Sequence, residues 1–422
     1  MKHIGILLLV CLACQQPVET KKILSPAQPE AAGFSTARLA RIDSTFTKWV
    51  NAGWMNGAIA FIARDGKIVY LKATGYKNPE TKDTFENTDI FRIASQTKAV
   101  TSVAAMMLWE EGKFLLDEPV SKYIPAFANA TVLDKFNPKD SSYTTVPAKR
   151  QVTIRDLLTH TSGIGYAQIG SPEAISIYAK TKITAGLDVY DDTLEDAINR
   201  LGVLPLMHNP GERWTYGLNT DVLGRLVEVW SGKTLDAFFA DHIFKPLGMN
   251  DTYFNVPEDK AARVVNFFTV NKDGQLEKAS GGLGTSIDYP TRIKSYFSGG
   301  GGLSSTIYDY AIFLQMLLNG GEYNGARLLS RNTVRMMTMN QINDLPFGDN
   351  KFGLGFEVQT EKGSAMQPLS EGSYSWGGAF STTYWVDPKE KMVVLMYRQM
   401  WGAHDSEIGE TFNTLVYQAL ND

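Results

Sequence analysis

The sequence has very little cysteine. Cys11 and Cys14 are the only two, and both lie near the N-terminus, so the rest of the chain has no thiol pair. This excludes a disulfide scaffold and a zinc site built from cysteines. The chain also lacks an excess of one charge, because 41 Lys and Arg face 45 Asp and Glu. With no basic cluster, the electrostatic footprint of a nucleic-acid-binding protein is missing, and we expect no nucleic-acid partner.

Long hydrophobic runs are missing as well. Beyond the N-terminal segment, no apolar run reaches the ~20 residues needed to span a bilayer. Hydrophobic residues nevertheless make up 44% and aromatic residues 11% of the 422 residues, which is typical of a folded globular protein. The length fits two or three domains, or one large α/β body with an insertion.

The first fourteen residues are typical of an export signal. A basic start at residues 1–3 precedes an apolar run at residues 4–13, which is too short to span a bilayer but suits a signal-peptide core. The ending Leu12-Ala13-Cys14 resembles a bacterial lipoprotein signal, which implies lipidation of Cys14. Cys11 departs from that pattern, in which Leu, Val or Ile is usual. The alternative to a lipoprotein signal is an ordinary secretory signal peptide that is cleaved near this position.

These residues predict an exported protein that is either periplasmic or a membrane-anchored lipoprotein. Residues 1–14 would be the signal peptide and residues 15–28 a polar tether. We expect membrane contact only through a lipid on Cys14. The sequence does not indicate the oligomeric state.

Periodic patterns place strands at both ends of the chain and helices between them. Helices are expected at residues 37–53 and 406–420, and strands at residues 58–63, 68–71, 381–386 and 392–397. The first two strands flank Asp65-Gly66, which is a strong hairpin signal. Residues from about 116 to 289 carry further helical patterns separated by Pro- and Gly-rich loops.

This distribution predicts a mixed α/β (α+β) fold. An antiparallel sheet flanked by helices would be built from residues 29–90 and 295–422, that is, from both ends of the chain. Residues 91–294 would form a mainly helical domain inserted between the two parts.

Several common catalytic motifs are absent. There is no Gly-x-Ser-x-Gly nucleophile elbow, and none of the five histidines falls in a His-Glu-x-x-His pattern. Gly232-Lys233-Thr234 lacks the upstream glycine of a phosphate loop, so we interpret it as the start of a helix. The four glycines at 299–302 lack the spacing of a dinucleotide site and indicate a tight turn. We therefore expect neither a metal nor an organic cofactor.

Ser95-Gln96-Thr97-Lys98 is the only Ser-x-x-Lys in the chain. On a helix, residues three apart share one face, so the Lys98 amine can reach the Ser95 hydroxyl and take its proton. The same helix N-terminus would stabilise an oxyanion at the Ser95 backbone N–H. Alone, the motif is weak, because a chain of this length contains about one by chance, and Ser95 is equally suited to cap the helix.

The surrounding residues resemble the serine β-lactamase and penicillin-binding-protein superfamily, in particular its branch related to class C β-lactamases. The matching blocks occur in order at residues 91–101, 116–125, 157–163, 214–216, 221–226 and 301–306. The resemblance extends from Pro29 to the C-terminus. It implies a β-lactamase/transpeptidase-like fold, with the helix that carries Ser95 beside the sheet.

The resemblance also implies residue roles. Ser95 would be the acylated nucleophile, Lys98 its proton acceptor, and Tyr216 a second acid/base that relays the proton to the leaving group. Because a free phenol has a pKa near ~10, Tyr216 would need the Lys98 cation beside it to act as a base. The third motif of the family matches Trp376-Gly377-Gly378-Ala379. Its first three residues would bind the substrate, since glycines let it approach the strand backbone closely, and the Ala379 N–H would be the second oxyanion donor.

Two departures from the family pattern bear on the substrate. Leu218 occupies the position of the family's substrate-binding Asn and would therefore contact the substrate, although it has no amide, and Asn219 comes one position late. Trp376 stands where the family has Lys or His. Without that amide and cation, an anionic β-lactam or a peptide with a free C-terminus is disfavoured. Trp-Gly-Gly resembles the family VIII carboxylesterases, whose substrates are neutral acyl esters. His160 could suggest a catalytic Ser-His dyad. In the family, however, the His-Thr-Ser-Gly segment at residues 160–163 is a structural turn, so we expect no catalytic role for His160.

We therefore expect an exported serine hydrolase that acts on a small acyl ester or amide, most plausibly a carboxylesterase for short acyl esters. The first alternative is a D-amino-acid peptidase or weak β-lactamase acting on cell-wall material. The second is a catalytically silent homologue that binds muropeptides or a partner protein, which the joint presence of Ser95, Lys98 and Tyr216 disfavours.

Overall fold

The computed structural model describes residues 23–184, 186–188, 191–273, 275–281 and 286–422. The expected signal peptide at residues 1–14, with Cys14, and residues 15–22 of the expected tether lie outside the described residues. Residues 24–27 belong to the fold rather than to a tether, because Leu24 is buried and Ser25–Pro26 pair with a strand of the central sheet. None of the described helices is both long enough and apolar enough to cross a bilayer.

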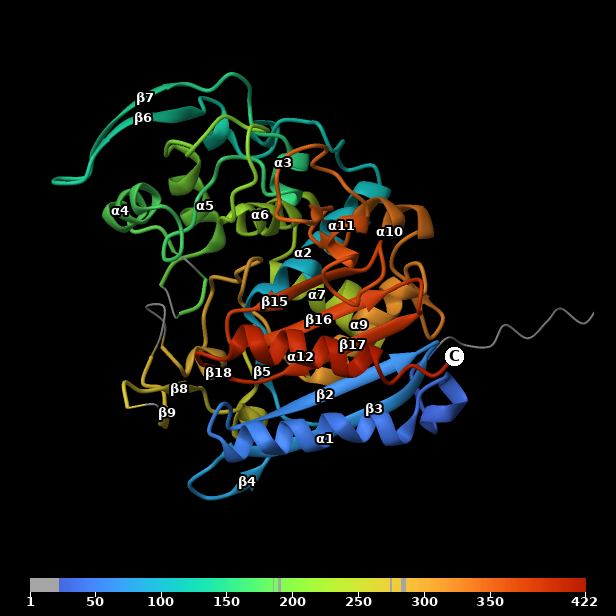
Figure 1. Ribbon diagram of the computed structural model, residues 1–422. Coiled ribbons are helices and arrows are strands. Elements are labelled where there is room, and N and C mark those ends of the chain that lie inside the picture. Colours follow the sequence, from blue (N-terminus) through green and yellow to red (C-terminus); the bar gives the residue numbers. More distant parts are fainter. Residues whose placement is uncertain (1–22, 185, 189–190, 274, 282–285) are drawn as a thin grey trace, which may run out of the picture.

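The centre of the described structure is a nine-stranded sheet whose strands come from both ends of the chain (Figure 1). Its order is β1-β3-β2-β17-β16-β15-β14-β13, with β4 beside β3. The strands are β1 (Ser25–Pro26), β2 (Gly57–Arg64), β3 (Lys67–Asn78), β4 (Asp83–Thr84), β13 (Lys351–Phe352), β14 (Glu357–Val358), β15 (Tyr374–Gly378), β16 (Thr382–Asp387) and β17 (Met392–Tyr397). The sheet thus confirms the prediction of a fold assembled from the two ends.

The pairings in this sheet are antiparallel except at one edge, where β1 runs parallel to β3. The predicted hairpin joins β2 and β3. Asp65 and Gly66 both have positive φ, 51° and 75°, which is the backbone that a tight two-residue hairpin turn requires. The central strands β2 and β17 pair along the whole of β17, from Met392 opposite Arg64 to Tyr397 opposite Ile59, and hold the two ends of the chain together.

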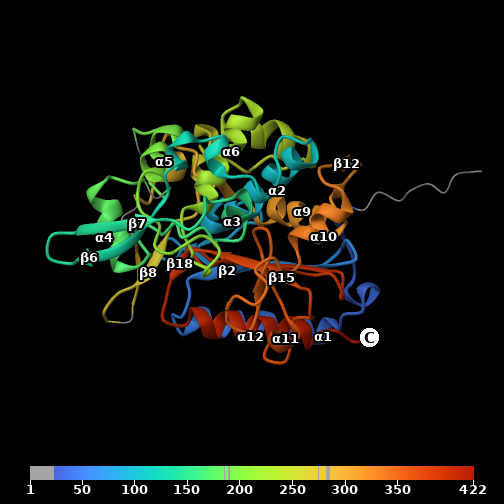
Figure 2. The same cartoon turned by 90° about the horizontal axis from the view of Figure 1, so that it is seen from above.

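Helices cover both faces of the sheet (Figures 1 and 2). Alternate residues of β2 point to opposite faces. Ala60 and Ile62 pack with α1 (Thr36–Asn51) and α12 (Asp405–Tyr417), whereas Ile59 and Phe61 belong to the larger core that contains α9 (Ile307–Leu318). The helices predicted at residues 37–53 and 406–420 are therefore confirmed, and they lie together on one face.

The middle of the chain forms the helical body beside the sheet. Its helices are α2 (Thr97–Glu110), α3 (Ile154–Leu158), α4 (Pro172–Lys180), α5 (Leu194–Gly202), α6 (Asn219–Ser231), α7 (Leu235–Phe239) and α8 (Lys245–Leu247). The remaining helices of the described chain, α10 (Arg331–Met337) and α11 (Glu361–Ser364), follow α9. The packing of α2 against α6 brings two distant segments together at the core. The division of the chain at residues 91 and 295 stays a prediction.

Short strands also form outside the central sheet, some of them in the middle of the chain, where the sequence indicated mostly helices. They are β6 (Thr131–Asn137) with β7 (Ser142–Pro147), β8 (Phe268–Val270) with β9 (Leu276–Lys278) and β18 (Met400–Trp401), β5 (Phe91–Arg92) with β10 (Ser304–Ser305), and β11 (Glu322–Tyr323) with β12 (Ala326–Arg327). The β6–β7 hairpin projects from the body in Figure 1. Every residue of β7 is exposed, so the hairpin lacks the alternating apolar pattern by which a strand is recognised in sequence.

Two tyrosines of the core hold Gln96, the residue that follows Ser95. Tyr397 of β17 donates a hydrogen bond of 2.6 Å to Gln96 Oε1, and Tyr310 of α9 donates one of 2.8 Å to the Gln96 carbonyl. All three residues are buried. The sheet and α9 thereby fix the position of the turn that precedes α2.

Removing the hydroxyl in Tyr397→Phe would leave the buried Gln96 Oε1 without its donor. An unsatisfied buried acceptor destabilises a protein by ~1–3 kcal/mol, so we expect the free energy of unfolding to fall by that amount in urea denaturation. Tyr143→Phe, which removes an exposed hydroxyl on β7, is the matched control and should be nearly neutral. Equal effects of the two variants would contradict this account of Gln96.

Candidate active site

Ser95 lies in a single turn of 3₁₀ helix, Ala94–Gln96, directly before α2. Ala94 is buried and has a φ of 41°, in the left-handed region that non-glycine residues rarely adopt. Holding such a residue stores ~1–3 kcal/mol of strain, which the surrounding contacts must offset. The residue before Ser95 thus has an uncommon backbone conformation. This conformation places Ser95 at the start of the helix.

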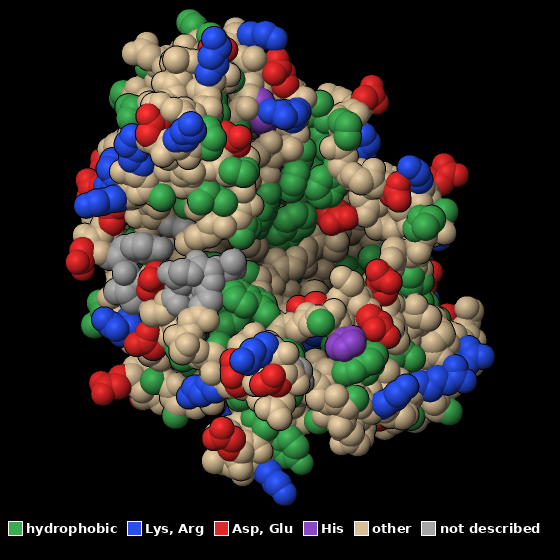
Figure 3. All heavy atoms as spheres, turned by 60° about the vertical axis from the view of Figure 1, so that its left-hand side comes forward, with side chains coloured by type: hydrophobic (Ala, Val, Ile, Leu, Met, Phe, Trp, Pro, Cys, Tyr) green, Lys and Arg blue, Asp and Glu red, His purple; other side chains and the backbone are tan. Residues whose placement is uncertain are grey.

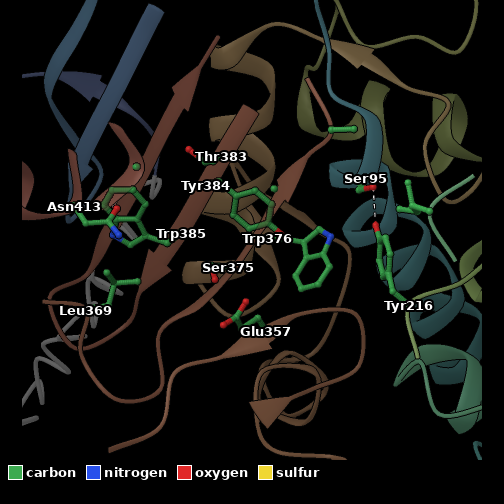
Figure 4. Close-up of a pocket in the computed structure, with 14 residues that line it drawn as sticks. Ser95, Tyr216, Glu357, Leu369, Ser375, Trp376, Thr383, Tyr384, Trp385 and Asn413 are labelled. Atoms are coloured by element: carbon green, nitrogen blue, oxygen red, sulfur yellow. Dashed lines mark hydrogen bonds between the residues drawn. The ribbon is translucent and has the colours of Figure 1, made fainter. Parts of the chain in front are cut away.

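The structure brings Ser95, Lys98 and Tyr216 together. Tyr216 OH donates a hydrogen bond of 2.6 Å to Ser95 Oγ, and Lys98 Nζ lies 3.3 Å from the same oxygen. Lys98 Nζ also lies 4.6 Å from the centroid of the Tyr216 ring, within the range of a cation–π contact. Figure 4 shows the hydrogen bond between Tyr216 and Ser95. Their catalytic roles stay a prediction, but the proximity that those roles require is present.

Lys98 is only 3% exposed, and its ammonium is directed by the glycine-rich turn. Lys98 Nζ donates a hydrogen bond of 2.7 Å to the Gly300 carbonyl. A Cβ atom on Gly300 would lie 2.4 Å from Asp221 Oδ2, so only glycine fits at this point. The turn expected at residues 299–302 therefore has a positioning function that sequence reasoning missed.

Asp221 is the buried group behind this turn. Its carboxylate accepts hydrogen bonds from Ser298 Oγ (2.6 Å) and Tyr296 OH (3.1 Å). Burial raises the pKa of the Asp221 carboxyl, while the Ser298 bond and the nearby Lys98 charge oppose that rise. The sequence contained a signal for this residue, because Asp221 begins the family block at residues 221–226. The apolar pattern of that block, however, predicted only a helix and no role for the Asp221 carboxylate.

The strand β15 forms the opposite wall. A Cβ atom on Gly378 would lie 2.3 Å from the Ile93 carbonyl oxygen, so β15 packs closely against the segment that leads to Ser95. Gly378 is not among the residues that line the groove, and its contact with substrate stays a prediction. Gly377, Trp376 and Ala379 do line the groove together with Ser95. This places the two predicted oxyanion donors, Ser95 and Ala379, on the same cavity.

The prediction that Leu218 contacts substrate is wrong. Leu218 precedes the first residue of α6, is 1% exposed and packs in the main core, because its position on the helix turns its side chain inward. Asn219 does not replace the missing amide either. It is buried, donates to His160 Nδ1 at 3.0 Å and accepts a hydrogen bond from Ser162 Oγ.

His160 lies behind Tyr216 rather than beside Ser95. Its ring centroid is 5.3 Å from that of Tyr216 and 5.6 Å from that of Phe352. Burial, aided by the charge of Lys98, holds the pKa of His160 well below its ordinary value of 6.5. His160 is therefore a neutral supporting side chain, as the structural-turn interpretation expects.

A groove of about 520 Å³ connects Ser95 with the outer strands of the sheet. In Figure 3 one face of the molecule is hollowed, and hydrophobic side chains gather along the hollow. Figure 4 shows the groove residues. They are Ser95, Ile169, Tyr216, Glu357, Leu369, Ser375, Trp376, Gly377, Ala379, Thr383, Tyr384, Trp385, Gly409 and Asn413. Within the described ranges, no group of three or more His, Cys, Asp or Glu is arranged to hold a metal ion.

A serine hydroxyl that is bonded to a phenol and lies one helical turn from a buried amine, in an open groove, is the arrangement of a serine hydrolase. The comparisons with known proteins agree. The profile of the family described as Beta-lactamase matches residues 42–417. The chain belongs to this family and is a serine hydrolase with a β-lactamase-like fold.

Individual relatives cover most of the chain. Protein Rv1367c of Mycobacterium tuberculosis is 32% identical over 361 residues, covering 82% of this chain and 86% of that protein. Esterase EstB of Burkholderia gladioli is 29% identical over 385 residues, covering 87% of this chain and 92% of EstB. Among solved structures, EstCE1, described as a hydrolase with promiscuous acyltransferase activity, matches with a TM-score of 0.77 and 24% identity, covering 90% of this chain and 99% of EstCE1. This last likeness shows the fold alone.

The neutral state of His160 predicts a pH dependence of stability. Below about pH 6.5 the unfolded chain binds a proton at His160 that the folded protein does not, so the free energy of unfolding decreases as the pH falls. One such proton contributes a slope of ~1.4 kcal/mol per pH unit. In His160→Gln, we expect urea denaturation between about pH 6.5 and 5 to show a shallower slope. His242→Gln changes a partly exposed histidine in the same way and is the control. Its free energy of unfolding should depend on pH as that of the wild type does. A wild-type slope in His160→Gln would contradict the lowered pKa of His160.

Proposed function

We propose that this protein is a carboxylesterase that cleaves short acyl esters through an acyl-enzyme on Ser95. The observation that carries the proposal is the contact of Ser95 Oγ with both the Tyr216 phenol and the Lys98 amine inside an aromatic-lined groove. The name of the relative EstB, an esterase, supports it.

In the proposed reaction, the Lys98 ammonium first loses a proton to solvent. Ser95 Oγ then attacks the ester carbonyl while its proton passes to the neutral Lys98 amine. The carbonyl oxygen becomes an oxyanion, which the backbone N–H groups of Ser95 and Ala379 stabilise. The C–O bond to the alcohol then breaks, Tyr216 supplies the proton that the alcohol needs, and Lys98 returns a proton to the phenolate. Water attacks the acyl-enzyme by the reverse sequence of proton transfers and releases the carboxylic acid.

The charges of the groove favour an ester over a substrate with a free carboxylate. Among the described groove residues there is no Lys or Arg, because Trp376 stands at the position where the family has a cation. The Lys98 ammonium is already directed at Ser95 and the Gly300 carbonyl. An anionic β-lactam or a peptide C-terminus would thus lose hydration without gaining an opposite charge.

A substrate panel tests the proposal. Protein lacking residues 1–22, which keeps β1 in place, should cleave p-nitrophenyl acetate and butyrate much faster than nitrocefin or D-Ala-D-Ala peptides. Ser95→Ala should lower kcat/KM for the esters by roughly 10⁴-fold or more, because the nucleophile is lost. Tyr216→Phe should lower it by about 10²–10⁴-fold, as expected for loss of general acid–base catalysis.

Tyr143→Phe, which removes a hydroxyl far out on the exposed β7 strand, is the control and should retain wild-type kinetics. Rapid nitrocefin turnover without ester cleavage would favour the β-lactamase alternative, and cleavage of D-Ala-D-Ala peptides alone would favour the peptidase. Ester cleavage that survives in Ser95→Ala would refute the mechanism.

We also propose that the enzyme is exported and anchored by a lipid on Cys14, on the strength of the signal-like residues 1–14. Full-length protein expressed in a bacterium should incorporate labelled palmitate and fractionate with membranes, and Cys14→Ser should do neither. Wild-type protein that is exported from the cytoplasm without incorporating palmitate would favour an ordinary secretory signal. Wild-type protein that stays in the cytoplasm would refute export.

A further inference from the structure

The loop between β15 and β16 contains Ala379, whose backbone N–H is one of the two proposed oxyanion donors. Gly378 pairs with Thr382 across the hairpin, and Ser381 has a φ of 62°. The Ser381 N–H donates a hydrogen bond of 3.0 Å to the Gly378 carbonyl. These features are typical of a three-residue hairpin loop that ends in a left-handed residue. The position of the Ala379 N–H therefore depends on this loop.

The hydrogen bond inside the loop fixes the direction of the Ala379 N–H. In a trans peptide, the carbonyl and the N–H of one peptide plane point in opposite directions. The Gly378 carbonyl and the Ala379 N–H share such a plane, and Ser381 holds the carbonyl inside the loop. The N–H then points out of the loop, and Ala379 lines the groove together with Ser95. A tilt of this one plane would turn the N–H away from the oxyanion.

Ser381 occupies a left-handed position, where glycine is preferred because it has no Cβ. Its side chain is tied down in return. Ser381 Oγ lies 2.5 Å from the Met400 carbonyl oxygen and 3.2 Å from Asp405 Oδ2, so its one proton is directed at two acceptors. Asp405 in turn forms an ion pair of 2.8 Å with Arg398, whose side chain is 2% exposed. Ser381 is thus fastened to the segment at residues 398–405, between β17 and α12.

Trp401 of the same segment holds the next peptide plane of the loop. Its Nε1–H donates a hydrogen bond to the Ala379 carbonyl, and its ring stacks on that of Phe380, with centroids 6.1 Å apart. The Arg398 N–H also donates a hydrogen bond of 3.2 Å to the Ser381 carbonyl. The peptide planes on both sides of Ala379 are therefore held by hydrogen bonds.

We propose that Ser381 and Trp401 are positioning residues, which hold the loop so that the Ala379 N–H faces the oxyanion formed during attack by Ser95. Neither is among the described residues that line the groove, so both act through the loop rather than on the substrate. This inference rests on the proposed esterase function and deepens it, because it names the side chains on which the second oxyanion donor depends. It also gives a reason for a serine at a backbone position that favours glycine.

The first test is Ser381→Ala, which removes the hydroxyl and leaves the left-handed residue without its tether. Removing an oxyanion donor outright lowers kcat by about 10²–10³-fold, so misdirecting one should lower kcat for p-nitrophenyl acetate by about tenfold. KM should change little, because the donor acts on the transition state. Ser373→Ala makes the same change at a buried serine just before β15, whose hydroxyl has no partner among the described residues. This control should retain the wild-type kcat.

Trp401→Phe keeps a ring to stack on Phe380 and removes the Nε1–H donor. Loss of this hydrogen bond should lower kcat by about three- to tenfold, again with little change in KM. Trp230→Phe is the matched control, because Trp230 Nε1 is buried and has no partner within the described chain. If Ser381→Ala fails to fold, Trp401→Phe decides the question.

Labelling with a fluorophosphonate keeps this test separate from the esterase proposal. Ser95 Oγ displaces fluoride from phosphorus in that reaction, and the phosphoryl oxygen occupies the place of the oxyanion. The second-order rate of labelling should therefore fall in Ser381→Ala and in Trp401→Phe by a factor similar to that for kcat.

The outcomes distinguish the two proposals. Wild-type kcat and labelling rates in both variants would overturn the positioning role and leave the esterase function standing. A wild-type protein that cleaves no ester, but whose labelling slows in both variants, would overturn the esterase function and support the positioning role. A change in KM alone, or an equal loss of kcat in the control variants, would reduce Ser381 and Trp401 to a structural role and overturn the proposal. A folded wild-type protein that neither cleaves esters nor is labelled would contradict both.

Discussion

The hydrogen bond between Tyr216 and Ser95, with the Lys98 ammonium beside both, is the contact on which the rest of this structure depends. Each partner comes from a different element: Ser95 from the 3₁₀ turn, Lys98 from the first turn of α2, and Tyr216 from the loop before α6. The packing of α2 against α6 keeps these elements together. The buried tyrosines that hold Gln96 add a link to the sheet. Much of the core thus serves to fix three side chains at hydrogen-bonding distance.

The electrostatics of the site are arranged around the single buried ammonium. Behind Lys98, the Asp221 carboxylate accepts hydrogen bonds from Tyr296 and Ser298 and packs against the Gly300 turn, whose carbonyl accepts from the lysine. The groove that Ser95 lines has several aromatic side chains and no Lys or Arg among its described residues.

The sequence predicted those parts of the site that local spacing determines. Ser95 and Lys98 are three residues apart at a helix start, so helical geometry alone brings them together. Tyr216 lies more than a hundred residues away, and only the family resemblance, not spacing, could place it there. Likewise, the hairpin of β2 and β3 was predictable from Asp65-Gly66, and the closing helix from its apolar period. The assembly of the sheet from both ends followed from where strands and helices occur.

What escaped prediction depends on long-range pairing. Glu357 faces the groove only because β14 pairs with β15 in one register, which no local pattern reveals. Leu218 was misplaced because its side chain turns into the core at the start of α6. In each case the position of a side chain was set by a neighbour distant in sequence.

The most direct test of the central claim is mass spectrometry of the protein after reaction with a fluorophosphonate. If Tyr216 and Lys98 activate Ser95, a single covalent adduct should form, and peptide mapping should place it on Ser95. Ser95→Ala should then remain unmodified under the same conditions. An adduct on another residue, or no adduct on a folded wild-type protein, would contradict the assignment of Ser95 as the nucleophile.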